Sequence, residues 1–259
     1  MITLDLSALY PLGGAGNSLA ALRLAQATQA KAVQAEEKSP QIARDIAAFN
    51  AAVAKGSDAK TVLANPAVMR VLLTANGMAD QLGFTALATK ALLSDPTDPN
   101  GLASKLSSTD ARWKTVATTF DFAKSGLAIL QTPSVLKSVA DQYAQQSWRQ
   151  SQDTQTPGIA QALAFLDQAA SAKSVDDILG NKVLRAVVLG ALGIPPQIAY
   201  QSLPAQEFAV SSRMSVARLQ DPKFVQSLAQ RFMMNQQSPA SSTGTDLMSL
   251  AVQANRLFV

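Results

Sequence analysis

The sequence predicts an all-α protein built from two tandem related helical domains, with helical extensions at its N- and C-terminal ends. Three observations support this prediction. The chain repeats itself at an offset of 116 residues, and its apolar residues recur at helical spacing. Most of its internal prolines also follow a residue type that favours the start of a helix.

The repeat aligns residues 48–87 with residues 164–203 without a gap. It contains 11 identities in 40 positions, where composition alone would give roughly 3. The identical pairs are Ala48/Ala164, Phe49/Phe165, Ala54/Ala170, Leu63/Leu179, Asn65/Asn181, Val71/Val187, Leu73/Leu189, Ala75/Ala191, Gly77/Gly193, Gln81/Gln197 and Leu87/Leu203. We therefore expect an internal duplication, in which one helical unit occurs twice.

The duplication divides the 259 residues into five segments, and the chain is long enough for two modest domains. We expect an N-terminal arm over 1–39 and a first helical repeat over 40–131. A connector over 132–156 leads to a second helical repeat over 157–237. Residues 238–259 form a linker and a C-terminal amphipathic helix in this interpretation.

The expected elements follow from apolar spacing and from helix-start signals. An Ala/Gln-rich stretch from Leu19 to about Glu36 has no breaker and predicts one long arm helix. Later helices are expected to start at Ser39-Pro40, Asn65-Pro66, Asp98-Pro99, Thr132-Pro133, Thr156-Pro157 and Asp221-Pro222. In each pair a capping residue precedes Pro, whose missing N–H costs nothing in the first helical turn.

Each repeat contains a short apolar helix that ends at a glycine. Val68, Val71, Leu72 and Ala75 follow the i, i+3, i+4, i+7 spacing of one helical face, and Gly77 then ends the helix. The second copy repeats this pattern with Leu184, Val187, Val188, Ala191 and Gly193. A stop glycine in both copies predicts a positive φ at both positions.

The remaining helices are predicted from single apolar faces. Trp113, Val116, Ala117 and Phe120 fit one face of a helix in the first repeat. Val135, Val139, Tyr143 and Trp148 predict a connecting helix, followed by a polar loop over 151–155. The last helix is expected after the capping pair Thr245-Asp246. Its apolar stripe consists of Leu247, Leu250, Ala251, Ala254, Leu257 and Phe258.

Composition excludes several kinds of chemistry. The chain has no Cys and no His, so a thiolate nucleophile, a Cys/His metal site and a His general base are all excluded. The net charge is +4, from 22 Lys and Arg against 18 Asp and Glu, and these residues form no basic block. We therefore expect no nucleic-acid partner, which would require a clustered basic face. We also expect no cofactor.

The sequence shows no cleavable signal peptide and no transmembrane helix. No basic residue precedes the first apolar stretch, and no apolar run approaches the roughly 18 residues of a membrane span. Location therefore stays open between the cytoplasm and export, since export without a cleaved signal remains compatible with this N-terminus. The oligomeric state is also left open.

Acidic residues offer two candidate sites with simpler structural explanations. Asp176 and Asp177 could form a carboxylate pair, but acidic residues also suit the positive end of a helix. Asp95, Asp98 and Asp110 could supply oxygens to Ca²⁺, but their spacing fits no known loop. Helix caps explain Asp98 and Asp110 better, so we predict no metal site.

Two further patterns also have simpler explanations. Gly13, Gly14 and Gly16 could cradle a phosphate, but no strand precedes them and no Gly-Lys-Ser/Thr follows. Trp113 with Arg112 could stack on a base or a sugar, although an aromatic core residue is the favoured interpretation. We predict no catalytic and no cofactor-binding residue, and we expect the protein not to be an enzyme.

Several short blocks resemble an uncharacterised bacterial family. The blocks are 174–184, 190–195, 217–224 and 231–232 in the second copy, and 101–106 and 110–122 in the first. Members of that family contain a duplicated helical domain of unknown function and are found mostly in flagellar gene clusters of alphaproteobacteria. The resemblance covers about residues 40–235. This chain departs from the pattern at Trp113, where a tyrosine is usual, and in a less acidic stretch over 195–207.

The resemblance implies association with the flagellum and other flagellar proteins as partners, but it transfers no functional residue. We expect a non-enzymatic structural component or assembly factor that acts through protein–protein contacts. The alternatives are a cytosolic chaperone or adaptor for a flagellar export substrate and, more remotely, a carboxylate-based cell-wall glycan hydrolase. The expected partner-binding residues are Leu247, Leu250, Ala254, Leu257 and Phe258, on a helix that either folds back onto its own domain or docks in a groove of a partner.

Overall fold

The computed structural model describes residues 15–237 and confirms the all-α class, because this part of the chain contains helices and no strand. The first half consists of α1 (Ala15–Glu37), α2 (Pro40–Lys55), α3 (Ala59–Leu63), α4 (Pro66–Ala75), η2 (Ala79–Phe84), α5 (Thr85–Leu92), α6 (Leu102–Ser107), α7 (Arg112–Phe120), α8 (Phe122–Ser125), α9 (Ala128–Gln131) and α10 (Pro133–Gln155). The second half consists of α11 (Ile159–Gln168), η3 (Ala169–Ser171), α12 (Val175–Gly180), α13 (Lys182–Ala191), η4 (Pro196–Tyr200), α14 (Leu203–Ser211), η5 (Val216–Gln220) and α15 (Pro222–Gln237). In this part of the chain no helix is long and apolar enough to cross a bilayer.

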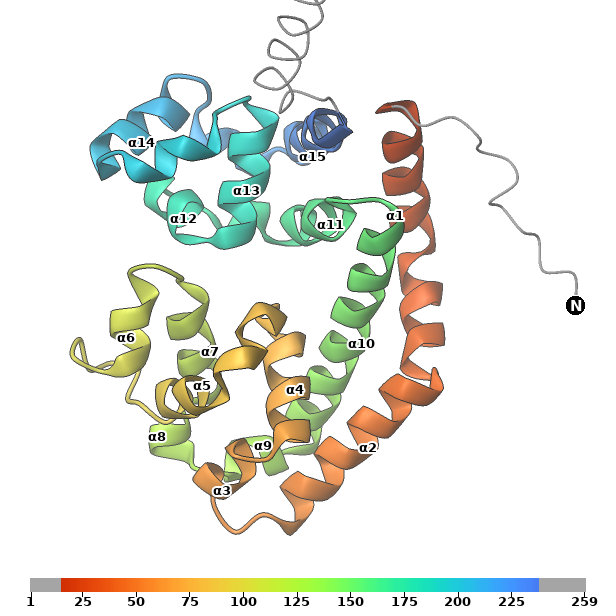
Figure 1. Ribbon diagram of the computed structural model, residues 1–259, viewed down its shortest axis with the longest axis vertical. Coiled ribbons are helices and arrows are strands. Elements are labelled where there is room, and N and C mark those ends of the chain that lie inside the picture. The colour runs from red at the N-terminus through yellow and green to blue at the C-terminus, as the bar shows by residue number, and fades with distance from the viewer. Residues whose placement is uncertain (1–14, 238–259) are drawn as a thin grey trace, which may run out of the picture.

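The two halves are stacked and share one order of elements (Figure 1). From α2 to α7, the first half passes through α3, α4, η2, α5 and α6. From α11 to α15, the second half passes through α12, α13, η4 and α14 in the same order, with the additional short η3 and with the 3-10 helix η5 where the first half has α6. This shared order is consistent with the expected duplication.

Side-chain caps start the corresponding helices of the two halves. The Asn65 side chain accepts a hydrogen bond from Ala67 N at the start of α4. Asn181, 116 residues later, accepts hydrogen bonds from the first backbone amides of α13. Asp58 and Ser174, separated by the same offset, cap α3 and α12. Such caps each contribute about 1 kcal/mol to helix stability.

Most of the predicted proline starts are correct, but two are not. Proline occupies the first position of α2, α4, α10 and α15, as expected. Pro99 and Pro157 instead lie in turns, and the next helices begin at Leu102 and Ile159. At the first of these turns the Asp98 side chain accepts a hydrogen bond from Asn100 N, so it caps the turn rather than a helix.

The predicted glycine stops are confirmed. Gly77 has φ +67° and Gly193 has φ +63°. After each glycine, the next amide reaches back across the turn: Met78 N donates to Leu73 O at 2.8 Å and Ile194 N donates to Leu189 O at 2.9 Å. This is the Schellman arrangement, which requires a left-handed residue at the glycine position.

Each half has its own hydrophobic core. Phe49 belongs to the first core and Phe165 to the second, and both are fully buried. The predicted face of α7 is also confirmed, since Trp113, Val116, Ala117 and Phe120 are all buried. Trp113 is therefore a core residue and offers no platform for stacking on a base or sugar.

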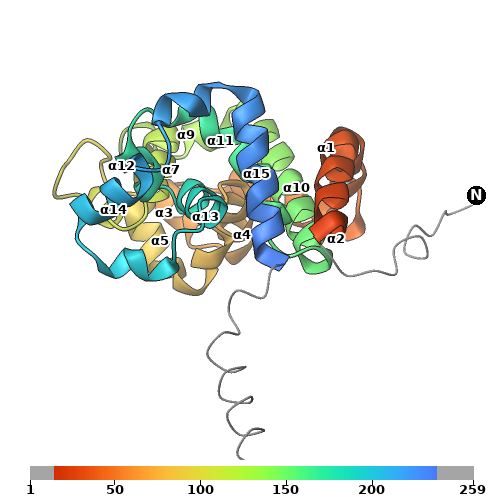
Figure 2. The same ribbon diagram turned by 90° about the horizontal axis from the view of Figure 1, so that it is seen from above.

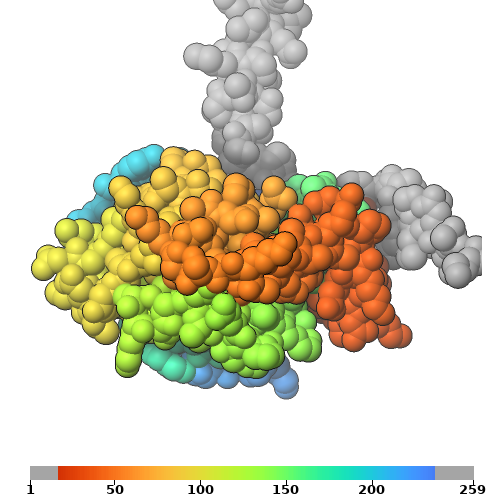
Figure 3. Space-filling model, turned by 90° about the horizontal axis from the view of Figure 1, so that it is seen from below, coloured from red at the N-terminus to blue at the C-terminus, as the bar shows by residue number. Residues whose placement is uncertain are grey.

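The arm and the connector are part of these cores rather than appendages. Helix α1 packs against α10, α11 and α15, and Leu22 on α1 is fully buried in the second core (Figure 2). Helix α10 supplies Tyr143 to the first core and Trp148 to the second. From below, the orange segments of α2 and α3 lie beside the green segment that leads into α10 (Figure 3).

The predicted polar loop over 151–155 is wrong, because α10 continues to Gln155. These polar residues contain no Gly or Pro, so nothing ends the helix before Thr156. Asp153 near the end of α10 accepts hydrogen bonds from the backbone amides of Gly158 and Ala160. The side chain therefore joins the end of α10 to the start of α11.

Candidate functional site

Both halves expose large apolar side chains at the same structural position. Phe84 is the last residue of η2 and is 61% exposed, and Tyr200 is the last residue of η4 and is 92% exposed. Leu87 on α5 and Leu203 on α14 are also exposed. The two members of each pair are 116 residues apart. We call these four residues together with Phe208 the paired apolar surface.

The backbone explains this placement. The left-handed glycine at the end of α4 or α13 turns the chain into a short 3-10 helix. That helix contains no buried residue in either half. The aromatic residue at its end, Phe84 in η2 and Tyr200 in η4, is therefore held outside the core in both halves.

The second half exposes one further aromatic side chain on this surface. Phe208 on α14 is 72% exposed. The position equivalent to it in the first half is Leu92, which is fully buried on α5. Two exposed positions, Phe84/Tyr200 and Leu87/Leu203, therefore occur in both halves. The third, Phe208, is exposed in the second half only. Large apolar side chains that are exposed on a protein surface can mark a contact site for another protein.

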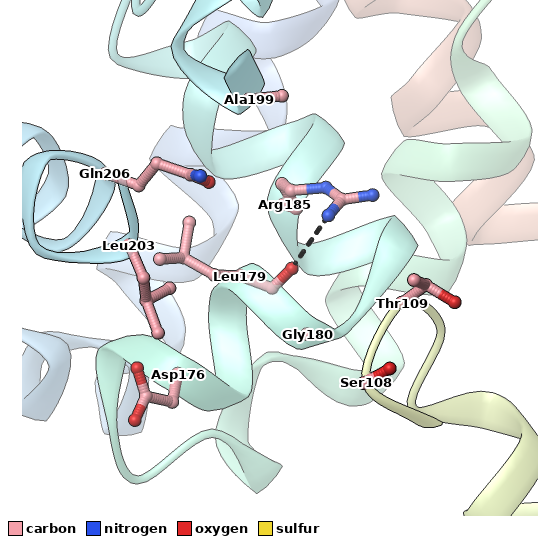
Figure 4. A pocket seen from close by; sticks show the side chains of 9 residues that line it. All are labelled: Ser108, Thr109, Asp176, Leu179, Gly180, Arg185, Ala199, Leu203 and Gln206. Carbon is pink, nitrogen blue, oxygen red and sulfur yellow. Dashed lines mark hydrogen bonds between the residues drawn. The ribbon is translucent and has the colours of Figure 1, made fainter. Parts of the chain in front are cut away.

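A cavity of about 390 Å³ lies beside the second half of this surface (Figure 4). Its lining residues are Ser108, Thr109, Asp176, Leu179, Gly180, Arg185, Ala199, Leu203 and Gln206. Ser108 and Thr109 belong to the loop after α6, whereas the others belong to the second half. The cavity is therefore built between the two halves.

Arg185 supplies the positive charge of this cavity. Its Nη1 donates to the backbone oxygen of Leu179 at 3.1 Å. No ion pair joins Arg185 to a carboxylate of residues 15–237. Asp176 also lines the cavity, and Figure 4 shows its carboxylate at the far end from the guanidinium. The cavity thus offers one cation and one anion at separate places.

Contacts between the halves fix the walls of the cavity. Ala111 N at the start of α7 donates to Gly180 O at the end of α12, with a distance of 3.2 Å. Nearby, Lys182 Nζ donates to Asp80 Oδ2 at 2.9 Å, and Arg112 Nη2 donates to the same oxygen at 3.0 Å. Asp80 of the first half is therefore held by a cation from each half.

These bonds determine the ionisation of Asp80. Burial alone would raise the pKa of the Asp80 carboxyl. The hydrogen bonds from Arg112 and Lys182 and the positive charge of Arg112 outweigh burial, so the pKa lies well below its usual range. Asp80 is therefore ionised at neutral pH and acts as a structural link between the halves.

The other predicted acidic sites are structural. Asp177 forms a capping box with Ser174 at the start of α12, as the helix-start interpretation expected. Its pKa is lowered by the hydrogen bonds from the Lys173 and Ser174 backbone amides. Asp95 accepts hydrogen bonds from Thr97 within its own turn. In residues 15–237, no group of three acidic residues could hold a metal ion.

Asp110 is not a metal ligand in this structure but the partner of Arg112. Its Oδ2 accepts from Arg112 Nη2 at 2.6 Å.

The glycans of a cell wall are usually cleaved between two facing carboxyl groups. The cavity between the halves has Asp176 as its single lining carboxylate.

Part of the predicted site lies outside the described residues. Leu247, Leu250, Ala254, Leu257 and Phe258 all belong to the segment after residue 237, and Gly13 and Gly14 precede residue 15. The structure instead reveals the paired apolar surface, which the sequence interpretation missed. The 116-residue alignment contained a usable signal, because it matches Leu87 with Leu203 and places Phe84 opposite Tyr200.

The fold and these surfaces define an all-α protein whose halves repeat one order of helices. The chain belongs to the family described as "Protein of unknown function (DUF1217)", whose model matches residues 75–225, more than half of the chain. No functionally curated protein matches it. The fold is similar to an X-ray crystal structure of a protein from Agrobacterium tumefaciens, with a TM-score of 0.74. That match has 24% identity and covers 89% of this chain and 98% of the other, so it shows the fold alone.

Proposed function

We propose that the protein acts through protein–protein contacts, as a flagellum-associated structural component or assembly factor. The observation that carries the contact role is the paired apolar surface. Phe84, Tyr200 and Phe208 are each more than half exposed, and two of them occupy equivalent positions in the two halves. Large exposed aromatic side chains are enriched at protein interfaces, where their burial supplies much of the binding free energy.

The flagellar role rests on the sequence resemblance described above. It is tested by immunolabelling purified flagella and basal bodies and by measuring motility of a deletion strain. We expect the protein to be found in one of these structures, with reduced motility when it is deleted. Normal motility together with no co-purifying flagellar protein would overturn the flagellar role.

A cytosolic chaperone or adaptor for an export substrate is the second candidate. The same apolar surface supports it, because a chaperone must also present apolar side chains to its client. Location separates the two functions. A chaperone stays in the cell with its client, whereas a structural component is recovered in the filament or in the culture supernatant.

The contact surface is tested separately from the location. The double variant Tyr200→Ser with Phe208→Ser removes two exposed aromatic rings, and affinity purification of the full chain then measures partner recovery. We expect identified flagellar partners to be lost while the fold is retained, as checked by circular dichroism. Leu24→Ser is the matched control, since Leu24 is 52% exposed on α1, outside the paired surface. Equal recovery with the double variant would show that this surface is not the contact site.

A further inference from the structure

Arg185 has unused hydrogen-bonding capacity in the cavity between the two halves. Within residues 15–237 its guanidinium donates one hydrogen bond, from Nη1 to Leu179 O at 3.1 Å, and it makes no ion pair. A guanidinium carries five N–H donors in a planar fork that matches the two oxygens of a carboxylate. Figure 4 shows one of its nitrogens directed away from Leu179 O, so the cavity contains a cation with donors left for an anion.

The other polar side chains that line the cavity mainly offer hydrogen-bond acceptors. Ser108 and Thr109 donate their hydroxyl hydrogens to carbonyl oxygens three residues earlier, so each keeps only lone pairs for a ligand. Gln206 donates from Nε2 to Gln201 O at 2.9 Å, which leaves its Oε1 as an acceptor. The Asp176 carboxylate forms no ion pair within the described residues. A ligand would therefore meet one charged donor and several acceptors.

Apolar side chains form the rest of the wall. Leu179, Ala199 and Leu203 line the cavity, whose volume of about 390 Å³ is at the small end of the range for ligand pockets. Leu203 is 51% exposed, so the cavity reaches the molecular surface at this residue. Leu203 also belongs to the paired apolar surface, which is the proposed contact site. A partner that covers this surface can therefore extend into the cavity.

The C-terminal end of a polypeptide matches this combination of groups. It has an α-carboxylate for the guanidinium, backbone N–H groups for the acceptors and, where its last residue is apolar, a side chain for the leucines. Phosphate would satisfy the cation but would leave the apolar walls uncovered. A fatty acid would cover these walls but would leave the acceptors without donors, and acceptors that are buried without a partner are costly.

We propose that the cavity binds the C-terminal end of a partner polypeptide whose last residue is apolar. The α-carboxylate of this chain end pairs with Arg185, and its terminal side chain packs against Leu179 and Leu203. Backbone N–H groups of its last residues donate to the oxygen acceptors on the walls. This binding mode rests on the contact role proposed above and names the chemistry of the partner segment that enters the cavity. Capture of a C-terminal carboxylate is a recurring mode of peptide recognition.

Peptide binding to the full chain tests this proposal. The probes are N-terminally fluorescein-labelled hexapeptides that begin with Gly-Ser-Gly-Ser and carry every pair of residues at the last two positions. Fluorescence anisotropy measures their Kd. We expect the tightest binders to end in Leu, Ile, Val, Met or Phe, with Kd values below about 1 mM. The tightest peptide is then made again with a C-terminal amide, which should bind about ten- to hundredfold more weakly.

A cycle of protein and peptide variants isolates the bond to Arg185. Arg185→Gln should weaken binding of the acid peptide about ten- to hundredfold but leave the amide peptide unchanged, because the amide has no charge for the guanidinium to bind. Arg185→Lys should retain part of the acid preference, since lysine keeps the charge without the fork. Arg213→Gln is the matched control, because the exposed Arg213 side chain donates to Ala209 O and lies outside the cavity. The ratio of acid to amide affinity is the readout, so a general loss of binding is not mistaken for loss of the carboxylate contact.

Four results would overturn the proposal. The first is that no hexapeptide binds with a Kd below about 1 mM. Acid and amide peptides of equal affinity would exclude recognition of the carboxylate. An acid-to-amide ratio that Arg185→Gln leaves unchanged, or that Arg213→Gln lowers equally, would remove Arg185 from the site. N-acetyl-leucine that bound as tightly as the best hexapeptide would assign the cavity to a small carboxylate rather than to a chain end.

These measurements use purified protein and synthetic peptides, so they are separate from the test of the proposed function. Loss of partners from the double variant Tyr200→Ser with Phe208→Ser, without any peptide binding, would leave the contact role standing and remove the carboxylate site. Retention of partners by that variant, with peptide binding intact, would move the contact from the exposed aromatic rings to the cavity.

Discussion

Lys182 at the start of α13 donates from Nζ to Asp80 Oδ2, 102 residues earlier in the chain, at 2.9 Å. Arg112 of the first half donates to the same carboxylate oxygen. Asp80 therefore lies between cations of the two halves, directly beside the backbone bond from Ala111 to Gly180. This cluster determines how the walls of the cavity are held relative to each other.

Asp80→Asn should lower the free energy of unfolding by about 1–3 kcal/mol, because it weakens bonds to the largely buried Arg112 guanidinium. The pKa of Asp80 is lowered in the folded state, so its contribution is present above the unfolded pKa of about 4 and is lost at lower pH. Urea denaturation at several pH values measures this. The difference between wild type and variant should shrink as the pH falls from about 6 to about 2.

Asp141→Asn is the control for this prediction. Asp141 pairs with exposed Lys137 on the surface of α10, and an exposed pair of this kind has little effect on stability. A variant of Asp80 that was no less stable than this control would contradict a structural role for the cluster.

Tyr143→Phe should destabilise the protein by about 1–2 kcal/mol, because Tyr143 Oη donates to buried Asp45 Oδ2 at 2.7 Å. Burial alone would raise the pKa of Asp45, but this bond, the bond from Gln41 and the interactions with Arg70 lower it overall. Without the hydroxyl the pKa rises, so acid-induced loss of stability should begin at a higher pH. Fluorescence-detected acid unfolding follows this shift. Tyr200→Phe is the control and should change nothing, since Tyr200 is almost fully exposed.

Gly77→Ala and Gly193→Ala should each cost about 1–2 kcal/mol, because an L-residue is strained at positive φ. An added Cβ meets no atom within 4 Å at either glycine, so the cost is conformational rather than steric. Thermal unfolding of the two single variants provides the comparison. Gly83→Ala also places its Cβ in open space but without a positive φ, and it should cause no loss. Similar losses from all three alanines would disprove the φ argument.

Local signals predicted the parts of the fold that depend on neighbouring residues. The start of α4 at Asn65 and its stop at Gly77 follow from capping and φ preferences, which act within a few residues. The end of α10 was missed because polar residues without a breaker fit a helix and a loop equally well. Local preference alone did not decide between them.

Positions that depend on the packing of distant segments were not predictable in this way. The sequence pattern predicts α1 as a helix with apolar residues but does not identify the helices against which these residues pack. Residues of α15 that contact α1 are about 200 residues away in the chain. The exposed surface is a similar case. Alignment pairs Phe84 with Tyr200, yet their exposure depends on how each 3-10 helix meets its core.

Leu22→Ala should lower the free energy of unfolding by about 2–5 kcal/mol, because it opens a cavity in the second core. Leu24, two positions later on the same helix, is 52% exposed, whereas Leu22 is fully buried. Leu24→Ala is therefore a matched control with the same change of side chain and helix propensity, and it should cost less than about 0.5 kcal/mol. Urea denaturation measures both. If α1 were a free arm, the two variants would have equal stability. A large difference confined to Leu22 would instead demonstrate that the N-terminal helix is required to complete the core of the C-terminal half.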